Sequence, residues 1–194
     1  GEAERGTLSL LLAYPVARWE ALLGKLVAHL AILSVAVLVG HGLAAGVAIW
    51  ADRGSLAGLP ALWRLSWSSV LLGATFLGAG YALSALSRRP SGAAGLAIGL
   101  WLGLVVLYDL ALLTAIVADN GGWFTTDAFP VALLANPADA FRLFNLTASG
   151  AAAAAAGVGG AADAIPLWQS LTSVLLWPLV ALALATAAFR KVTP

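Results

Sequence analysis

Four long runs of apolar residues dominate the chain. They cover residues 22–49, 66–86, 93–117 and 168–189, and the last contains a proline, Pro178. A helix needs roughly 20 residues to cross a hydrocarbon core of about 30 Å, so each run is long enough to span a membrane. No segment alternates apolar and polar residues over about ten positions, as the strands of a membrane barrel do. The pattern therefore predicts an all-α integral membrane protein with four membrane-spanning helices.

A short amphipathic segment, residues 2–13, precedes the first run. Its polar face holds Glu2, Arg5 and Ser9, and its apolar face holds Leu8 and Leu11, with Leu12 at the border. Glu4 departs from this pattern. Pro15 ends the segment, because proline cannot donate a helical backbone hydrogen bond. Such a helix lies flat at the membrane surface, where it either transmits force from another protein or simply anchors the chain; amphipathicity alone favours neither role.

The composition agrees with a membrane domain and excludes several other classes. Hydrophobic residues make up 61% of the 194 residues and charged residues 10%, against about 25% charged residues in soluble domains. Residues 1–194 are therefore expected to form a single membrane domain with no room for a separate soluble enzyme. The chain has no cysteine, which excludes disulfides and thiolate metal sites, and no methionine. An amphipathic opening without a preceding span suggests that the chain is truncated at its N-terminus.

The basic residues are unevenly distributed between the connections. Seven of the ten fall on one side of the predicted membrane domain and three on the other, which makes the first side cytoplasmic by the positive-inside rule. The cytoplasmic set is Arg5, Arg18, Lys25, Arg88, Arg89, Arg190 and Lys191, and the outer set is Arg53, Arg64 and Arg142. The net charge of +1 gives no indication of a nucleic-acid partner, and none is expected.

The connection over residues 119–166 is long, faces outward and contains a predicted helix. Asn136 has the position of an N-cap, Pro137 that of the first helical residue, and Asp139 that of an acid in the first turn. The aromatic and aliphatic residues that follow predict a short helix that dips into the membrane interface. The later part, residues 148–162, is almost wholly alanine and glycine and is interpreted as a mobile loop.

The chain lacks the motifs of the common enzyme classes. Gly24 and Lys25 resemble the end of a phosphate-binding loop, but that motif also requires a glycine five residues before Gly24 and a hydroxyl group after Lys25. Trp19 and Leu26 stand at these positions, so the chain is not expected to hydrolyse ATP by itself. A serine nucleophile elbow and a zinc-binding histidine pair are also absent. No catalytic, cofactor-binding or metal-binding residue is therefore predicted.

Three ionisable residues lie inside the predicted spans. His29 and His41 are separated by about 18 Å along one helix, so they cannot share a metal ion. Asp109, in the third span, is costly in lipid unless it faces protein or water. His41 and Asp109 both lie toward the outer leaflet, where they could pair. They either fix helix packing through an interhelical hydrogen bond or mark a polar point on a substrate path.

Glycines repeat at small-residue spacing in the third span, at Gly95, Gly99 and Gly103. Such a stripe lets another helix backbone approach closely. That helix belongs either to a second copy of the chain or to the same chain.

The opening residues include Glu2-Ala3-Glu4-Arg5-Gly6-Thr7-Leu8, Tyr14-Pro15-Val16-Ala17-Arg18 and Leu23-Gly24-Lys25. In this they resemble the cytoplasmic coupling helix of type-2 ABC transporter permeases. In that family the helix precedes the third of six spans, which implies two further spans upstream and a separate ATPase subunit that binds the ATP. The ATPase-coupling residues implied by the resemblance are Glu2, Glu4, Arg5, Gly6, Thr7, Leu8, Leu11 and Leu12.

Two further segments, Trp101–Leu113 and Asn136–Phe144, are similar to permeases that serve maturation of the copper centre of nitrous oxide reductase. The resemblance covers nearly the whole chain except the alanine- and glycine-rich insert. It implies a homodimer in the cytoplasmic (inner) membrane of a bacterium or archaeon, with a cytoplasmic ATPase and a periplasmic accessory protein. The accessory-protein face implied by the resemblance is Asn136, Pro137, Asp139, Phe141, Arg142 and Phe144.

The transported species stays open at this point. Without cysteine and methionine the chain lacks the soft ligands that select Cu(I), so its residues do not support copper passage. A sulfur-containing species, or mechanical transmission to the accessory protein without bulk transport, fits at least as well. The nearest alternative function is a generic type-2 exporter of a lipid, drug or polymer. A membrane scaffold that transports nothing and only anchors partners is the alternative from another class.

Overall fold

The computed structural model describes residues 18–87, 90–147 and 165–190, and all regular elements in these ranges are helices. The long helices are α2 (Arg18–Ala51), α3 (Leu59–Leu86), α4 (Pro90–Leu102), α5 (Tyr108–Asp119) and α10 (Leu167–Arg190). The short elements are η1 (Arg53–Gly58), the π turn η2 (Gly103–Leu107), the π turn η3 (Phe124–Ala128), α6 (Phe129–Ala135) and α7 (Pro137–Leu146).

The four predicted spans and the all-α fold are confirmed. Four helical stretches are long and apolar enough to cross a membrane: Leu22–Ala51, Arg53–Leu86, Ser91–Asp119 and Leu167–Arg190. The second begins well before the apolar run, because η1 continues into α3. Pro60 stands in the first turn of α3, where a missing backbone donor costs nothing. The fourth continues as a helix through Pro178.

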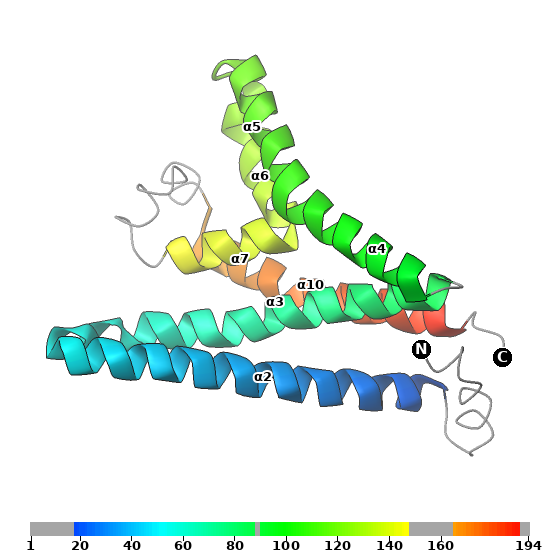
Figure 1. The fold of residues 1–194 in the computed structure, drawn as a ribbon. Helices are drawn as coiled ribbons and strands as arrows, with labels where there is room; N and C mark the ends of the chain where they lie inside the picture. The colour runs from blue at the N-terminus through cyan, green and yellow to red at the C-terminus, as the bar shows by residue number, and fades with distance from the viewer. Residues whose placement is uncertain (1–17, 88–89, 148–164, 191–194) are drawn as a thin grey trace.

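The long helices form a layer from which one span departs. Helices α2, α3 and α10 lie side by side, whereas α4 and α5 lead away from them at a wide angle (Figure 1). The start of α2, the end of α3, the start of α4 and the end of α10 all lie at one end of the molecule (Figure 1). This grouping agrees with the topology expected from the basic residues. Which side of the membrane that end faces stays a prediction.

Small residues bring α3 and α10 together. A Cβ atom added at Gly78 would lie 2.9 Å from the Cβ of Ala181, so the two backbones approach as closely as a glycine allows. Further along the same contact, Ala82, Ala185 and Ala188 are buried against one another. Without a hydrophobic driving force in lipid, this close van der Waals packing is what holds two spans together.

The glycine stripe of the third span has an open surface. Cβ atoms added at Gly95, Gly99 or Gly103 would meet no other atom within 4 Å. Of the two interpretations left open by the sequence, close packing within the chain is therefore absent among the described residues.

Helices α6 and α7 form a helical pair that turns back into the bundle between α5 and α10 (Figure 1). The chain comes back beside α5 along α6, turns at Asn136 and continues at a wide angle along α7, which packs against α3 and α10 (Figure 1). The buried contact consists of Ala140 and Phe144 against Val174, and the ring of Trp67 meets that of Phe144 edge-on at 5.2 Å between centroids. The predicted helix is therefore confirmed, and it packs against α3 and α10. Its position at the membrane interface stays a prediction.

Candidate functional site

Asn136 holds the turn between α6 and α7. Its side chain is fully buried, and its Oδ1 accepts a hydrogen bond from Ala138 N at 3.0 Å, which is the N-cap that the sequence predicted. Its extended backbone ends α6, and Pro137 follows at the start of α7. The other end of the amide, Nδ2, donates to Leu104 O in the third span at 2.6 Å. One side chain therefore starts α7 and fastens it to the span α4–α5.

The π turn explains why a carbonyl of the third span is open to this bond. In η2 the backbone N–H of Tyr108 bonds Gly103 O, five residues back, before α-helical bonding resumes. A change from five-residue to four-residue spacing leaves one carbonyl without a backbone donor, and such a group is costly inside a membrane domain. Leu104 O is the next carbonyl after Gly103, and Asn136 supplies its donor.

A charged cluster forms the second link between α7 and the third span. One guanidinium nitrogen, Arg142 Nη1, lies 2.5 Å from Asp109 Oδ2 and 2.9 Å from Asp139 Oδ1. Asp109 comes from α5, and the other two residues are one turn apart on α7. The side chains of Arg142 and Asp109 are 42% and 40% exposed, whereas Asp139 is 4% exposed. Asp139 Oδ2 is buried and has no hydrogen-bond partner among the described residues.

Burial raises the pKa of the Asp139 carboxyl to about 7, because the charged form loses its hydration. The neighbouring carboxyl of Asp109 raises this pKa further, and Arg142 opposes the rise. The loss of hydration therefore has a larger effect on the pKa of Asp139 than its ion pair with Arg142.

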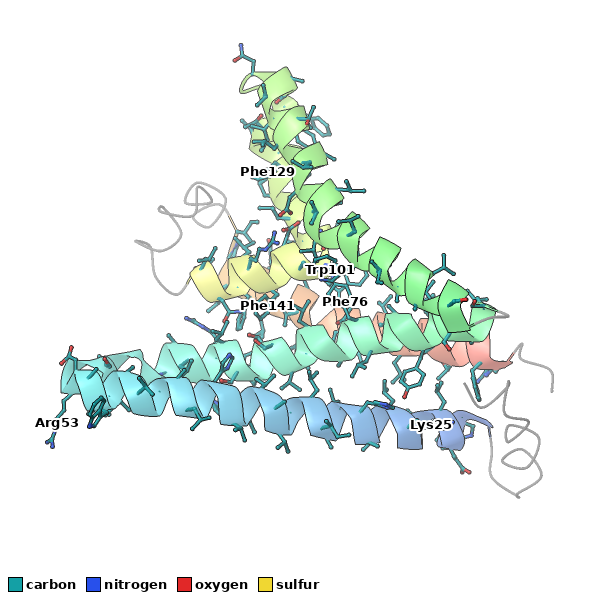
Figure 2. The ribbon with its side chains drawn as sticks, viewed as in Figure 1. Lys25, Arg53, Phe76, Trp101, Phe129 and Phe141 are labelled. Atoms are coloured by element: carbon teal, nitrogen blue, oxygen red, sulfur yellow. The ribbon has the colours of Figure 1, made fainter. Side chains whose placement is uncertain are left out.

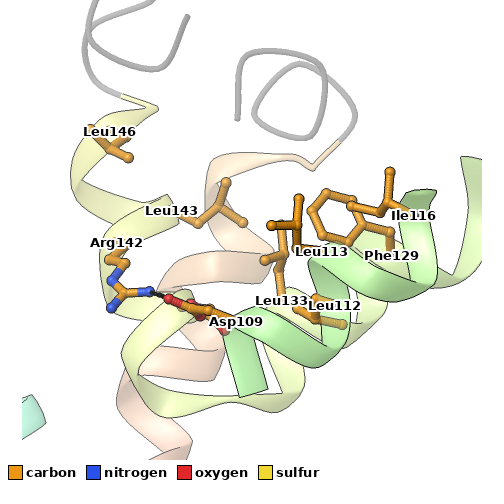
Figure 3. A pocket seen from close by; sticks show the side chains of 10 residues that line it. Asp109, Leu112, Leu113, Ile116, Phe129, Leu133, Arg142, Leu143 and Leu146 are labelled. Carbon is orange, nitrogen blue, oxygen red and sulfur yellow. Dashed lines mark hydrogen bonds and ion pairs between the residues drawn. The ribbon is translucent and has the colours of Figure 1, made fainter. Parts of the chain in front are cut away.

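The cluster forms the polar end of a cavity of about 360 Å³ between α5, α6 and α7 (Figure 3). Figure 3 shows Asp109 and Arg142 pointing toward each other at one end of it. The remaining wall is apolar and consists of Leu112, Leu113, Ile116, Phe129, Leu133, Leu143 and Leu146. The cavity therefore suits water and small polar groups at one end and hydrocarbon at the other.

A second cavity, of about 350 Å³, lies on the other side of Arg142, between α3, α4 and α7. Phe76, Trp101 and Phe141 contribute aromatic side chains to it and come close together in Figure 2. Arg142 lines both cavities, so the charged cluster stands between them.

His41 and Asp109 do not pair in the structure. His41 Nδ1 lies 2.8 Å from Ser66 Oγ on α3, while Asp109 binds Arg142. The Ser66 hydroxyl donates to Leu62 O, so its oxygen accepts from His41, and the proton of the ring is therefore assigned to Nδ1. The pairing that the sequence left open is therefore not formed, because α4 and α5 diverge from α2. The hydrogen bond to Ser66 gives His41 a packing role between α2 and α3.

Four of the six residues assigned to an accessory-protein face are buried inside the chain. Asn136, Pro137, Asp139 and Phe144 pack against the spans, and Phe141 and Arg142 are partly exposed. In the single chain, these four side chains are therefore not available for direct contact with a partner. The role of the outer connection in binding an accessory protein stays a prediction.

The other predicted site residues divide into two groups. The ATPase-coupling residues Glu2, Glu4, Arg5, Gly6, Thr7, Leu8, Leu11 and Leu12 lie outside the described residues. His29 lies on α2, where its Nδ1 is 2.8 Å from the hydroxyl of Tyr81. In the parts of the chain that the structure describes, no three His, Asp or Glu side chains are grouped closely enough to hold a metal ion.

Sequence reasoning missed the partners of the charged residues. The sequence marked Asp109 as an expensive residue in lipid, and it assigned Asp139 and Arg142 to the accessory-protein face, but it did not connect either of them with Asp109. The spacing of Asp139 and Arg142 places them one turn apart on a helix, which was the available signal. The contact of this pair with Asp109 depends on α7 turning back into the bundle, and no local pattern indicates that.

The four apolar helices and the helical pair inserted between them define a multi-pass α-helical membrane protein. The sequence comparisons are more specific. The family profile described as ABC-2 family transporter protein matches residues 1–193. The chain belongs to this family, and it is an ABC transporter permease.

Two curated relatives are similar over nearly the whole chain. A protein named "Probable ABC transporter permease protein NosY" from Pseudomonas aeruginosa is 44% identical over 197 residues, covering 98% of this chain and 70% of the relative. A protein of the same name from Stutzerimonas stutzeri is 42% identical over 198 residues, with the same coverage. These matches confirm the resemblance to type-2 ABC transporter permeases and to NosY in particular.

Proposed function

We propose that this chain is the membrane-spanning subunit through which a cytoplasmic ATPase acts on the outer side of the membrane, in maturation of the copper centre of nitrous oxide reductase. ATP binding and hydrolysis on the ATPase move the amphipathic segment over residues 2–13. That movement tilts the spans and reshapes the outer connection. The chain itself carries no ATPase site.

The observation that carries this proposal is the double attachment of α7. Its polar side is fastened to the third span by Asn136 and Arg142, and its apolar side is packed on α3 and α10 through Ala140 and Phe144. Any change in the angle between α4–α5 and the other spans must therefore act on α7. A rearrangement begun at the inner ends of the helices would reach the outer side in this way.

Helix α6 is held in the same manner at both flanks. The Tyr108 hydroxyl on α5 donates to Ala132 O at 2.8 Å, and the Ser173 hydroxyl on α10 donates to Leu134 O at 2.6 Å. These bonds use carbonyls at the end of α6, which lack helical donors. The α6–α7 pair is thus bound to spans on two sides, as a transmitting element requires.

The proposal includes partners and a location. We place the chain in the cytoplasmic membrane of a bacterium or archaeon, as a homodimer with one ATPase on its inner face and a periplasmic accessory protein on its outer face. The open glycine stripe at Gly95, Gly99 and Gly103 supports a second copy, since no described helix of the same chain covers it. The relatives named NosY support the link to nitrous oxide reductase.

The nature of the cargo separates two versions of the proposal. The absence of cysteine and methionine argues against passage of Cu(I) through this chain. The two versions are transport of a sulfur-containing species, and mechanical transmission to the accessory protein without bulk transport. Export of an amphipathic molecule is a second candidate, favoured by the two cavities with mainly apolar walls on either side of Arg142.

The test is co-purification with the ABC ATPase of the same organism and stimulation of its ATPase activity. We expect Leu8→Asp to abolish stimulation, because it places a charge on the apolar face of the amphipathic segment. Ser9→Asp is the matched control, since it adds the same charge to the polar face. Equal stimulation by the wild type and Leu8→Asp, or no association with an ATPase, would leave the membrane scaffold as the better account.

A further inference from the structure

The charged cluster on α5 and α7 carries more negative than positive charge. Asp109 and Asp139 share one nitrogen of Arg142, so two carboxylates meet a single guanidinium. A neutral cluster therefore needs one more positive charge or one proton.

The neighbouring residues of α5 and α7 do not supply it. Among the described residues of α5, the other titratable group that feels the charge of Asp139 is the phenol of Tyr108, and its hydroxyl already donates to Ala132 O. On α7 itself, Arg142 is the single basic residue. The start of α7 offers a partial positive charge to Asp139, but Asn136 Oδ1 already accepts from Ala138 N there.

The other packed elements do not supply it either. Helices α4 and α6 and the π turn η2 contain no charged residue. The charged residue of α10 is Arg190, in its last turn, and that of α3 is Arg64. The Arg64 guanidinium lies over the ring of Phe144 at 5.7 Å from its centroid. In the described part of the chain, Arg142 therefore remains the one cation bound to the two acids.

The buried oxygen Oδ2 of Asp139 is the atom at which a proton would supply the missing positive charge. Asp139 Oδ2 is shielded from solvent and has no hydrogen-bond donor among the described residues, although Asp139 lines the 360 Å³ cavity. An ionised carboxylate buried without donors for one of its oxygens is expensive, and neutralisation removes that expense. A protonated carboxyl also needs no donor at that oxygen, because it becomes a donor itself.

We propose that the cluster is a proton-binding site in which Asp139 carries one exchangeable proton on Oδ2 while α7 is attached to α5. With the proton bound, one carboxylate and one guanidinium remain and the cluster is neutral. When the proton leaves to water in the cavity, the cluster becomes negative inside the protein. Separation of α7 from α5 relieves that charge by admitting water, so proton binding favours the attached position of α7. This inference concerns the chain's own residues and does not depend on the proposed function.

The test is an infrared titration of the full chain in lipid nanodiscs. We expect the carbonyl stretch of a protonated carboxyl that persists above the ordinary Asp range of about 4 and disappears as the pH rises through about 7. Asp139→Asn should remove this band. Asp127→Asn is the matched control, because Asp127 is an exposed acid of the same outer connection, and it should leave the band unchanged.

A second variant keeps the test decisive if Asp139→Asn folds poorly. Asp109→Asn removes the neighbouring negative charge, so the titration should move to lower pH. The proposal is overturned if the wild type shows no such band, if the band survives in Asp139→Asn, or if Asp109→Asn does not move it. A midpoint that changes when sodium is replaced by a bulky organic cation would also overturn it, since that result assigns the site to a metal cation.

Discussion

Replacing Asn136 by alanine removes two hydrogen bonds from the turn between α6 and α7. Loss of the N-cap bond to Ala138 N costs about 1 kcal/mol. Loss of the bond to Leu104 O leaves a carbonyl of the π turn without a donor, which costs about 1–3 kcal/mol. We therefore expect Asn136→Ala to lower the free energy of unfolding by roughly 2–4 kcal/mol.

Asn136→Ser separates the two contributions. Serine also caps helices well, but its shorter side chain does not reach Leu104 O, so only the second cost of about 1–3 kcal/mol should remain. The assay is reversible unfolding of the full chain in mixed micelles, followed by circular dichroism. Thr114→Ala, at an exposed position of α5, is the control and should stay within about 0.5 kcal/mol of the wild type. A wild-type stability for Asn136→Ala would refute the argument that this amide fastens α7 to the third span.

Three further predictions follow from the packing and the charged cluster. Gly78→Val should destabilise the chain by about 1–3 kcal/mol, because the new side chain meets Ala181, whereas Gly80→Ala has open space and should be tolerated in the same unfolding assay. Ser66→Ala should cost about 0.6 kcal/mol, a typical interhelical hydrogen bond in a membrane protein, and a cost near zero would mean that His41 finds another partner. Because the pKa of Asp139 is raised to about 7, the folded chain holds a proton that the unfolded chain releases, so stability should fall as the pH rises from about 4 to about 7 and then stay level. Thermal unfolding of Asp139→Asn, measured over the same pH range, should show no such loss of stability. An identical loss in the variant would assign the pH dependence to another group.

The elements that follow from local rules could be predicted from the sequence. The four spans appear as apolar runs of sufficient length, and the start of α7 appears as Asn136 followed by Pro137. Both depend on short-range physics: the thickness of a bilayer and the need of a helix start for side-chain acceptors.

The site could not be predicted because it depends on how the spans are arranged. The sequence predicts similar depths for Asp109 and His41, yet α4 and α5 leave the layer of α2, α3 and α10 (Figure 1). His41 therefore contacts Ser66 and Asp109 contacts Arg142. The partner of Asp109 is instead Arg142, which is 33 residues away in sequence and reaches it because α7 turns back into the bundle. The π turn has no sequence signature either, and its open carbonyl became evident only with its partner, Asn136.

The central claim is that a nucleotide-driven change in the third span is transmitted through α7. Because the chain has no cysteine, a single pair of labels can be introduced at Val117 on α5 and Leu43 on α2, both exposed, at 71% and 67%. The measurement is the distance between these labels, by pulsed electron resonance, in the complex with the ATPase, with and without ATP. We predict that ATP shifts the distance distribution, and that Asn136→Ala broadens it. Identical distributions in a complex that hydrolyses ATP would contradict the account.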